Sequence, residues 1–409
     1  MAASHLKPGV HITPFVLPGL ESVRNPCDRI YVHSVTPVRG QQPTYCFNEP
    51  SRHAGIFNGI LTGNCTEIIE FSSPEESASC NLASLSLPAF VDQSTGTFDY
   101  QALYRASRVF IRALDRVVDI NLYPIESARR SNLRHRPLGL GVQGLADVFC
   151  LLRLRFGSDA SKVVNRRIAE TMYFAALTES HALTQVVRGP SGEITGPYPS
   201  IDENGGAPIR HGLFQFDLWQ DDFKDTDKPD GWQPDPALGW DWEDLRTKVI
   251  RDGVRNSLLI APMPTASTSI ILGNVEAFEP YYGMIYVRST KSGEFYQMCR
   301  PLVEELIKRG LWEVITHPTT GKTYIPLKDQ IMAQGGSIQN IAEIPDDLKE
   351  VFVCITDLKL KDLTEMARDR GVFTDQSMSL NVHFRNKDDL MPDLLKYMLY
   401  AWKLGLKTI

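Results

Sequence analysis

A short, uninterrupted apolar run restricts the fold of this chain more than any other feature. Residues 257–261 read Ser-Leu-Leu-Ile-Ala and lead directly into Pro262. Such a run is typical of a strand buried on both faces of a parallel sheet. Neighbouring parallel strands need long crossover connections, which are usually helices. We therefore expect helices to alternate with strands along the chain, as they do in α/β proteins.

Several other segments have the periodicity that this fold class requires. Residues 100–119 are predicted to form an amphipathic helix, with four arginines off its apolar face. Residues 378–384 alternate between apolar and polar side chains, which indicates a strand. Further helices are predicted at 161–188, 301–310, 356–371 and 389–405, and the first helix should bury Leu103, Ala106, Phe110, Leu114 and Val117.

Two regions depart from this regular pattern. Residues 1–64 contain frequent prolines and glycines without helical periodicity, so we expect a loop-rich or disordered lead-in that packs poorly against the rest. Residues 189–245 are rich in Gly, Pro, Asp and Trp and are predicted to be a long surface insertion. Its Phe214, Phe216 and Trp219 need something to pack against. The predicted organisation is a lead-in of residues 1–64 followed by one domain of residues 65–409.

Charge and cysteine usage exclude several classes of protein. A net charge of −6 argues against a nucleic-acid partner, because phosphate binding needs a basic surface. No apolar run approaches the roughly 18 residues of a membrane helix, and the N-terminus lacks a signal-peptide core. The odd number of cysteines and the absence of C-x-x-C pairs argue against a disulfide framework or a metal site and favour a reducing cytoplasm. The cysteines are Cys27, Cys46, Cys65, Cys80, Cys150, Cys299 and Cys354.

The glycines of residues 139–144 match the G-x-G-x-x-G string of dinucleotide-binding proteins. That motif should follow a buried strand, and the preceding residues 131–137 do not resemble one. We therefore expect close packing of a helix at these glycines rather than a nucleotide site.

A thiol and a carboxylate lie two residues apart at Cys65 and Glu67, in a segment rich in strand-forming residues. On an extended chain they would point to the same side, where the thiol could lose a hydrogen and the carboxylate could carry a proton. A second thiol, Cys80, follows a turn and opens another apolar run. Cysteine is also a common inert core residue, so this spacing alone leaves a structural role open.

A loop of small hydroxylated residues, Thr265-Ala266-Ser267-Thr268, follows the predicted buried strand. Ligands of α/β proteins gather at the carboxyl ends of strands. Small residues expose backbone N–H groups, and the hydroxyls add further donors, so the loop could hold a phosphate by hydrogen bonds. An ordinary Ser/Thr-rich turn explains the pattern equally well.

Taken together, these stretches resemble the large, catalytic chain of class I ribonucleotide reductase of the eukaryotic type, over its C-terminal part. The resemblance begins at Cys65 and continues to the end of the chain. The matching stretches are Cys65–Ile68, Cys80–Leu85, Arg136–Asp147, Arg255–Thr268, Ile271–Asn274, Ser292–Phe295, Asp375–Asn381 and Trp402–Lys407.

The resemblance implies a fold and a chemistry. The fold would be part of a ten-stranded α/β barrel with peripheral helices, incomplete at both ends. The reaction would be the reduction of ribonucleoside diphosphates to 2′-deoxyribonucleoside diphosphates. Cys65 would become the thiyl radical that takes hydrogen from the ribose, and Glu67 would handle the proton of the 3′ hydroxyl. Cys80 would belong to the redox disulfide, and Thr265–Thr268 would hold the substrate diphosphate.

The same resemblance implies partners. The radical would come from a small chain with a di-iron centre, and thioredoxin or glutaredoxin would supply electrons. No cofactor is expected on this chain itself, and a homodimer is left open.

Three departures from the family pattern lead to further expectations. Residues 1–64 stand where the family has its regulatory nucleotide sites and the cysteine that pairs with Cys80, so we expect both to be missing. The family has an asparagine two residues before the radical cysteine, where this chain has Gly63; Asn64 is adjacent. The chain also stops before the family's relay tyrosines and shuttle cysteines. We therefore expect this polypeptide alone not to reduce ribonucleotides.

Two alternatives remain open from the sequence. One is a truncated, non-catalytic relative that keeps part of the barrel for binding a partner. The other is a plain thiol oxidoreductase that uses Cys65 and Cys80, which would require thiols with depressed pKa values. In either case Cys65 and Glu67 are expected to lie close to Thr265–Thr268.

Overall fold

The computed structural model describes most of the chain from Glu67 onward. The described ranges are 67–188, 193–220, 232–290, 293–316, 321, 323–383 and 390–408, together with four short strands before residue 64. These are β1 (His11–Ile12), which pairs with β2 (Ile30–Tyr31), and β3 (Ala54–Phe57), which pairs with β4 (Ile60–Gly63). Asn64 and Cys65 lie outside the described residues, so their placement and the packing of residues 1–64 stay predictions.

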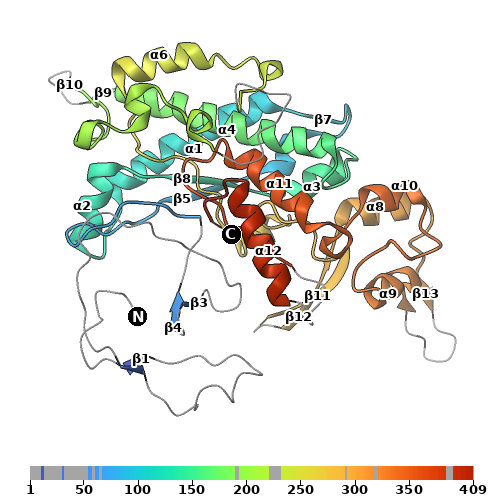
Figure 1. The fold of residues 1–409 in the computed structure, drawn as a ribbon. Helices are drawn as coiled ribbons and strands as arrows, with labels where there is room; N and C mark the ends of the chain where they lie inside the picture. Colours follow the sequence, from blue (N-terminus) through green and yellow to red (C-terminus); the bar gives the residue numbers. More distant parts are fainter. Residues whose placement is uncertain are drawn as a thin grey trace.

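Five extended segments lie side by side through the middle of the molecule. β5 (Leu82–Ser86) pairs in parallel with β8 (Gly139–Gln143), and Leu140 of β8 forms a parallel bridge with Ile260. Beyond Ile260 lies segment 375–381, whose Gln376 N–H donates to the Ile260 carbonyl (3.2 Å). The Ser377 N–H in turn donates to the carbonyl of Glu67 (3.0 Å). Figure 1 shows β5 and β8 beneath helices α1 and α4.

Two glycines allow these segments to lie close together. A Cβ atom on Gly139 would come within 2.4 Å of the Leu82 side chain, and one on Gly141 within 2.9 Å of the Met263 sulfur. Glycine is required where neighbouring chains approach this closely. As expected, residues 131–137 form no strand, because helix α2 extends to His135. Close packing is present at the G-x-G-x-x-G string, but at Gly139 and Gly141 the neighbours are extended segments and not the expected helix. The string itself forms buried strand β8, and Gly144 adopts a left-handed conformation (φ +83°) before the next helix.

The helices pack mainly on one side of these strands (Figure 1). α1 (Tyr100–Ile120) packs along α4 (Asp159–Thr184), and α11 (Leu360–Gly371) packs on α4 as well. The carboxylate of Asp99 caps α1 by accepting from the Ala102 N–H (2.7 Å). Remaining elements are β6 (Val91–Asp92), β7 (Thr97–Phe98), α2 (Glu126–His135), α3 (Leu145–Leu151), β9 (Val187–Arg188), β10 (Glu193–Ile194), α7 (Thr268–Leu272), β13 (Ile315–Thr316) and β14 (Thr323–Tyr324).

Two helix predictions need correction. The buried stripe of α1 lies one residue later than expected near its end, because Val118 is fully buried whereas Val117 is 37% exposed. The helix predicted over 161–188 ends at Thr184, and Val187 already belongs to strand β9. Val186 is therefore exposed instead of facing the core.

The region predicted to be a surface insertion carries part of the core. Phe214 and Phe216 of the α5 region (α5, Gln215–Leu218) are buried against Trp242, at ring-centroid distances of 5.2 and 4.9 Å. Trp242 begins α6 (Trp242–Asp252), which packs on α4. The expectation that these aromatic residues need a packing partner is thus met by α4 and α6. The two ends of this region, around residues 193–220 and 232–245, are integral to the fold.

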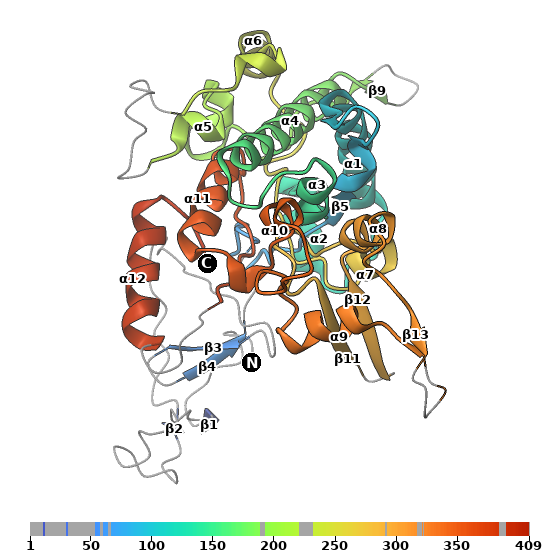
Figure 2. The ribbon, with the colours of Figure 1, turned by 90° about the vertical axis from the view of Figure 1, so that its right-hand side faces the viewer.

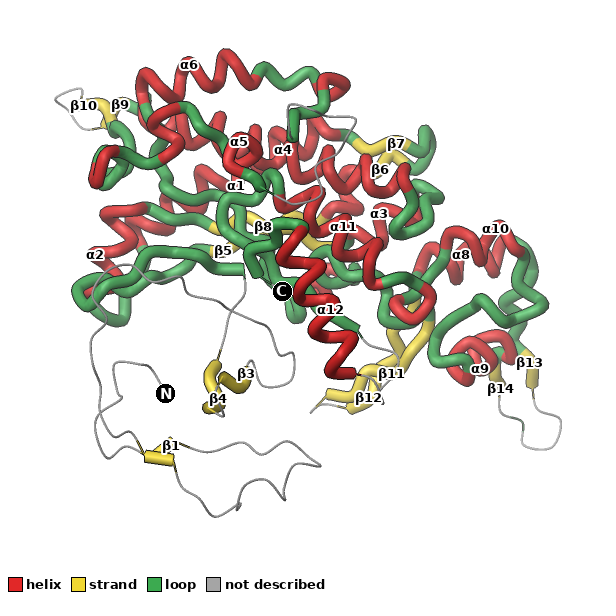
Figure 3. Tube along the Cα trace, viewed as in Figure 1, coloured by secondary structure: helices red, strands yellow, loops and turns green. Residues whose placement is uncertain are grey.

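A smaller group of elements extends to one side of the strands. It contains the hairpin of β11 (Ile285–Thr290) and β12 (Gly293–Met298), followed by α8 (Arg300–Lys308), α9 (Pro326–Ala333) and α10 (Asp346–Val351). Figure 2 shows this group on the side away from α12 (Leu390–Lys403), and Figure 3 shows how much loop connects its elements.

The fold is mixed α/β, as predicted, with parallel pairing at its centre. Within the described ranges the named strands pair only two by two, and no closed ten-stranded sheet is present. The strands predicted at 257–261 and 378–384 are extended segments rather than named strands: Ile260 forms a single bridge, and described residues 378–383 form none. No helix among the described residues is long and apolar enough to cross a membrane.

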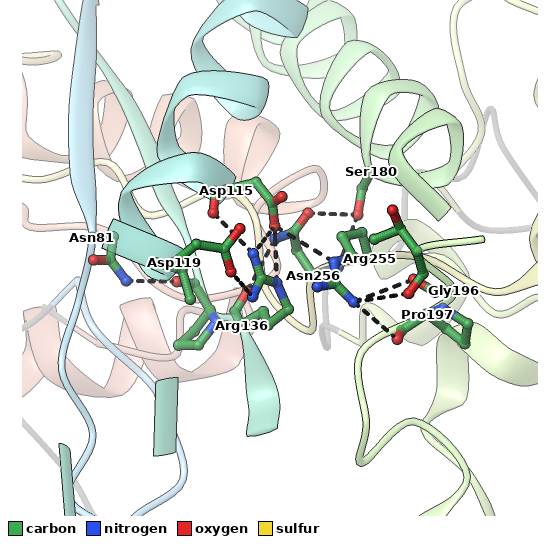
Figure 4. Close-up of polar contacts among 12 residues, drawn as sticks. Asn81, Asp115, Asp119, Arg136, Ser180, Gly196, Pro197, Arg255 and Asn256 are labelled. Atoms are coloured by element: carbon green, nitrogen blue, oxygen red, sulfur yellow. Dashed lines mark hydrogen bonds and ion pairs between the residues drawn. The ribbon is translucent and has the colours of Figure 1, made fainter. Parts of the chain in front are cut away.

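A buried ion network connects three helices and strands of the core (Figure 4). Arg136, which is 2% exposed, donates to the Asp115 carboxylate (2.7 Å) and to Asp119 (2.7 Å). Asn256 donates to the same Asp115 oxygen (3.0 Å) and accepts from the hydroxyl of Ser180 (2.9 Å). All members are hydrogen-bonded, which is the condition under which charges can be buried.

Replacement of Arg136 by alanine is expected to leave the buried Asp115 carboxylate with Arg255 as its remaining charged neighbour, at 3.9 Å instead of the 2.7 Å of Arg136. Removing one member of a buried ion pair costs about 3–5 kcal/mol of unfolding free energy. Urea denaturation would measure the loss. Arg116 lies on the exposed face of α1, the helix that carries Asp115. Arg116→Ala should therefore change the unfolding free energy by less than about 0.5 kcal/mol. Equal destabilisation by the two variants would contradict this account.

Candidate active site

Glu67 is held inside the protein by two serines. Its side chain is buried, and its Oε2 accepts a hydrogen bond from the Ser379 hydroxyl (2.7 Å). Its backbone carbonyl accepts from the N–H of Ser377 (3.0 Å). The Ser379 N–H donates to the carbonyl of Pro262 (3.2 Å), which lies three residues before Thr265. Glu67 therefore lies beside the strand that leads into the predicted phosphate loop.

The segment that carries these serines is fixed by side chains as well as by its backbone. The Asp375 carboxylate accepts from the N–H groups of Leu259 and Ile260 (2.8 Å each). The Gln376 side chain accepts from the Ile69 N–H (3.0 Å) and donates to the Leu138 carbonyl (2.9 Å). Burial raises the pKa of Asp375 to about 6, against the opposing effect of its hydrogen bonds.

The residues that follow helix α12 close the other side of this segment. The Lys407 ammonium donates to three consecutive carbonyls, those of residues 374–376, at 3.0, 2.9 and 2.7 Å. The Thr408 hydroxyl lies 2.5 Å from the hydroxyl of Ser377. Segment 375–379 is thus held between Glu67 on one side and the residues after α12 on the other.

The predicted phosphate loop divides into a buried and an exposed part. Thr265 is buried, and its hydroxyl accepts from the Ala277 N–H (2.8 Å), so this side chain serves the structure of the loop. Ala266, Ser267 and Thr268 are exposed. The Thr268 hydroxyl makes only a long contact to the Thr265 carbonyl (3.4 Å). The part of the loop available to a ligand is therefore 266–268.

Cys80 is exposed and lies two residues before the start of β5. The next residue, Asn81, is buried and anchors the chain by donating to the carbonyl of Pro137 (3.2 Å). The strand register places Cys80 at the amino end of the parallel strands, whereas Thr265–Thr268 follow their carboxyl end. The structure thus brings Glu67 near the strand entering the loop and leaves Cys80 at the opposite end.

Sequence reasoning missed the residues that position Glu67. Ser379 and Gln376 were read only as parts of a strand and a motif, although the alternation of 378–384 places Ser379 opposite the apolar Met378 and Leu380. The alternation indicates that this segment has a polar face, which in the structure contacts Glu67 through Ser379. Among the described residues, no group of three or more His, Cys, Asp or Glu side chains could hold a metal ion.

Glu279 marks the end of the serine-bearing segment. Its Oε1 accepts from the Asn381 N–H (3.2 Å), and burial raises the pKa of its carboxyl to about 7. The nearby guanidinium of Arg370 lies over the ring of Phe278 (4.2 Å), and burial lowers the pKa of Arg370 to about 10. Both groups are thus less readily charged than in water.

The Glu67–Ser379 contact is expected to contribute to stability. Ser379→Ala removes the only donor described for Oε2, and an unsatisfied buried carboxylate oxygen costs about 1–3 kcal/mol. A double-mutant cycle with Glu67→Gln and Ser379→Ala, followed by urea denaturation, would measure the coupling. Additive effects of the two substitutions would show that the contact is not formed in solution.

The raised pKa of Glu279 predicts a pH dependence of stability. The folded state binds the proton more tightly than the unfolded state, so this contribution is fully present below pH 4.5 and is lost as the pH rises through about 7. Glu279→Gln should abolish this component. The difference in unfolding free energy between the wild type and Glu279→Gln, measured at pH 4.5, 5.5, 6.5 and 7.5, should therefore decline with pH. A constant difference would contradict the shift.

Comparisons with known proteins identify the family of the chain. A model of the ribonucleotide reductase barrel domain matches residues 48–409. The large subunit of ribonucleoside-diphosphate reductase from Plasmodium falciparum (isolate Dd2) is 45% identical over 344 residues, which are 84% of this chain and 38% of the relative.

Other relatives give the same result. The large chain from Neurospora crassa is 43% identical, covering 84% of this chain and 33% of its own length. The large subunit from Danio rerio is also 43% identical, with 84% and 38% covered. This chain spans less than two fifths of the length of these relatives. Because the family model covers most of the chain, the protein belongs to the ribonucleotide reductase barrel-domain family.

Proposed function

We propose that this chain provides the catalytic barrel of a ribonucleoside-diphosphate reductase, which converts ribonucleoside diphosphates into 2′-deoxyribonucleoside diphosphates. The observation that carries the proposal is the buried Glu67 carboxylate, held by Ser379 beside the strand that enters loop 265–268. A proton-carrying group must be fixed within reach of its substrate, and this carboxylate is fixed by Ser379 while its backbone is fixed by Ser377 of the same segment. The names of the relatives support the same activity.

In the proposed reaction, Cys65 as a thiyl radical takes the hydrogen from the 3′ carbon of the ribose. Glu67 then accepts the proton of the 3′ hydroxyl, and the 2′ hydroxyl leaves as water. Cys80 and a second thiol become a disulfide and so supply two electrons and two protons: one proton completes the leaving water, and the other becomes the hydrogen on the 2′ carbon. Glu67 returns its proton to the 3′ oxygen. The hydrogen returns to the 3′ carbon from Cys65. The exposed hydroxyls and backbone of 266–268 hold the diphosphate, with Thr265 fixing the shape of the loop.

The wider assembly follows from the same proposal. The domain would comprise residues 65–409 as part of a ten-stranded barrel, with segments 67–69, 375–381 and 258–263 and strands β8 and β5 as adjacent members. A small chain with a di-iron centre would generate the radical. Thioredoxin or glutaredoxin would reduce the disulfide, and the enzyme would work in the cytoplasm.

The diphosphate site can be tested by binding alone. Ser267→Ala combined with Thr268→Val removes two exposed donors and should weaken the binding of labelled cytidine diphosphate about 10-fold, as expected for hydrogen bonds to a charged group. Equilibrium dialysis would measure the dissociation constant. Ser94→Ala, on an exposed loop, is the matched control and should leave binding unchanged. Unchanged affinity in the double variant would remove loop 265–268 from the site.

The chemistry is tested separately, with an active small chain, a dithiol and a ribonucleoside diphosphate added. Any deoxynucleotide formed should disappear in Cys65→Ser and fall steeply in Glu67→Gln. Turnover that persists in Cys65→Ser would overturn the proposed role of that thiol.

A further inference from the structure

We propose that a cavity of about 650 Å³ beside the β11–β12 hairpin is a binding site for a planar aromatic ligand that carries an anionic group. The cavity lies between α7, the chain that follows it, and the facing side chains of the hairpin. Figure 2 shows these elements next to one another. Neither Glu67 nor residues 265–268 line the cavity, so it differs from the candidate active site.

The carboxylates of the cavity are already occupied by partners within the protein. Asp147 accepts from the Tyr281 hydroxyl (2.5 Å) and from the Val275 N–H (2.8 Å). Glu276 pairs with Arg288 (3.4 Å), and Glu279 accepts from the Asn381 N–H. These carboxylates already accept hydrogen bonds or form an ion pair within the protein, so they offer little to a cationic ligand.

The hydrogen-bond donors of the cavity are not used in this way. The exposed Arg300 side chain makes no hydrogen bond or ion pair within the described ranges, and the same holds for the side chain of Gln297. The guanidinium lies flat against Gly273, where an added Cβ would come within 3.2 Å of Nη2. The hydroxyl of Ser269, a residue only 1% exposed, also has no hydrogen-bond partner. Unused donors around one cavity favour an acceptor-rich, negatively charged ligand.

Aromatic rings provide the second half of the argument. Tyr282 is 62% exposed, and its ring meets that of Tyr286 edge to face, with the centroids 5.4 Å apart. Tyr296, on the other strand of the hairpin, is also exposed, although the Lys328 ammonium lies over one face of its ring at 4.6 Å from the centroid. Exposed tyrosine faces at the mouth of a cavity offer stacking surfaces to a planar ring. With Arg300 nearby, the site can hold a ring and an anionic group at once.

A nucleotide and a simple aromatic phosphate share this chemistry, so both serve as probes. Binding of ADP, phenyl phosphate and adenosine would be measured by isothermal titration calorimetry. The chain would carry Ser267→Ala and Thr268→Val, so that binding by the proposed diphosphate loop is weakened about 10-fold and equally in every variant compared. Binding of ADP alone would identify a nucleotide site, and binding of both phosphates a general aromatic-anion site. Adenosine binding as tightly as ADP would overturn the requirement for an anion.

Substitutions then locate the binding. In the same background, Arg300→Ala should weaken ADP or phenyl phosphate about 10-fold or more, since it removes a charge-assisted donor. Tyr282→Ala should weaken binding about 5-fold or more through lost stacking, whereas Tyr282→Phe should change it less than about 2-fold. Arg116→Ala, an exposed arginine remote from the cavity lining, is the matched control. Both target residues are exposed, so the variants should fold, which circular dichroism would verify.

Three results would overturn the proposal: no binding of either phosphate at millimolar concentration, equal affinity in Arg300→Ala and its parent, or equal losses in Arg300→Ala and Arg116→Ala. Because every variant compared carries the same weakened loop, these results do not bear on the proposed reductase function. Loss of cytidine diphosphate binding on disabling the loop, in turn, does not bear on the cavity.

Discussion

The placement of Glu67 depends on the hydrogen bonding of segment 375–379. This segment lies between two neighbours in the interior, and its buried backbone groups must all find partners there. The structure meets this need with side chains as well as with backbone: the Asp375 carboxylate serves two N–H groups of one neighbour, and Gln376 connects residues on both sides. The serines that hold Glu67 are positioned only because the rest of the segment is fixed.

The same solution recurs in the buried ion network around Arg136. Arg136 shares two carboxylates, and Asp115 in turn serves Asn256. Where the compensation is incomplete, the protonation equilibrium moves instead, as in Asp375 and Glu279, whose carboxyls are harder to ionise. Burial therefore either recruits partners or favours the neutral form. The candidate site shows both effects: Glu67 has a hydrogen-bond partner in Ser379, and the pKa of nearby Asp375 is raised by burial.

Local periodicity predicted most of the longer helices but not the shorter ones such as α2, α9 and α10. Four helices lie close to the ranges expected from the sequence: α1, α8, α11 and α12. An amphipathic helix can be predicted locally, because its apolar residues recur three and four positions apart. The strands were harder. Strand β8 is glycine-rich and was not recognised, since its glycines are explained by Leu82 and Met263, which are distant in sequence.

The candidate site shows the same limit. The acid Glu67 and the loop 265–268 could be named from the sequence, but not the donor that holds the acid. Ser379 lies 312 residues after Glu67, and no local pattern specifies a contact over that separation. Likewise, the buried role of Thr265 depends on Ala277 folding back onto it. The local sequence shows which residues could take part in chemistry. It does not show which of them lie in contact in the folded protein.

The ion network around Arg136 has a consequence for the order of folding. Its members come from residues 115–119, 136, 180 and 256, so no single stretch of chain can complete it. Until α1, α4 and the strand entering at Asn256 have assembled, collapse would enclose a charge with too few partners. Such a network penalises partly assembled states more than it rewards the finished one, and its non-local contacts form slowly. The network therefore makes the assembly of α1, α4 and the segments around Arg136 and Asn256 cooperative.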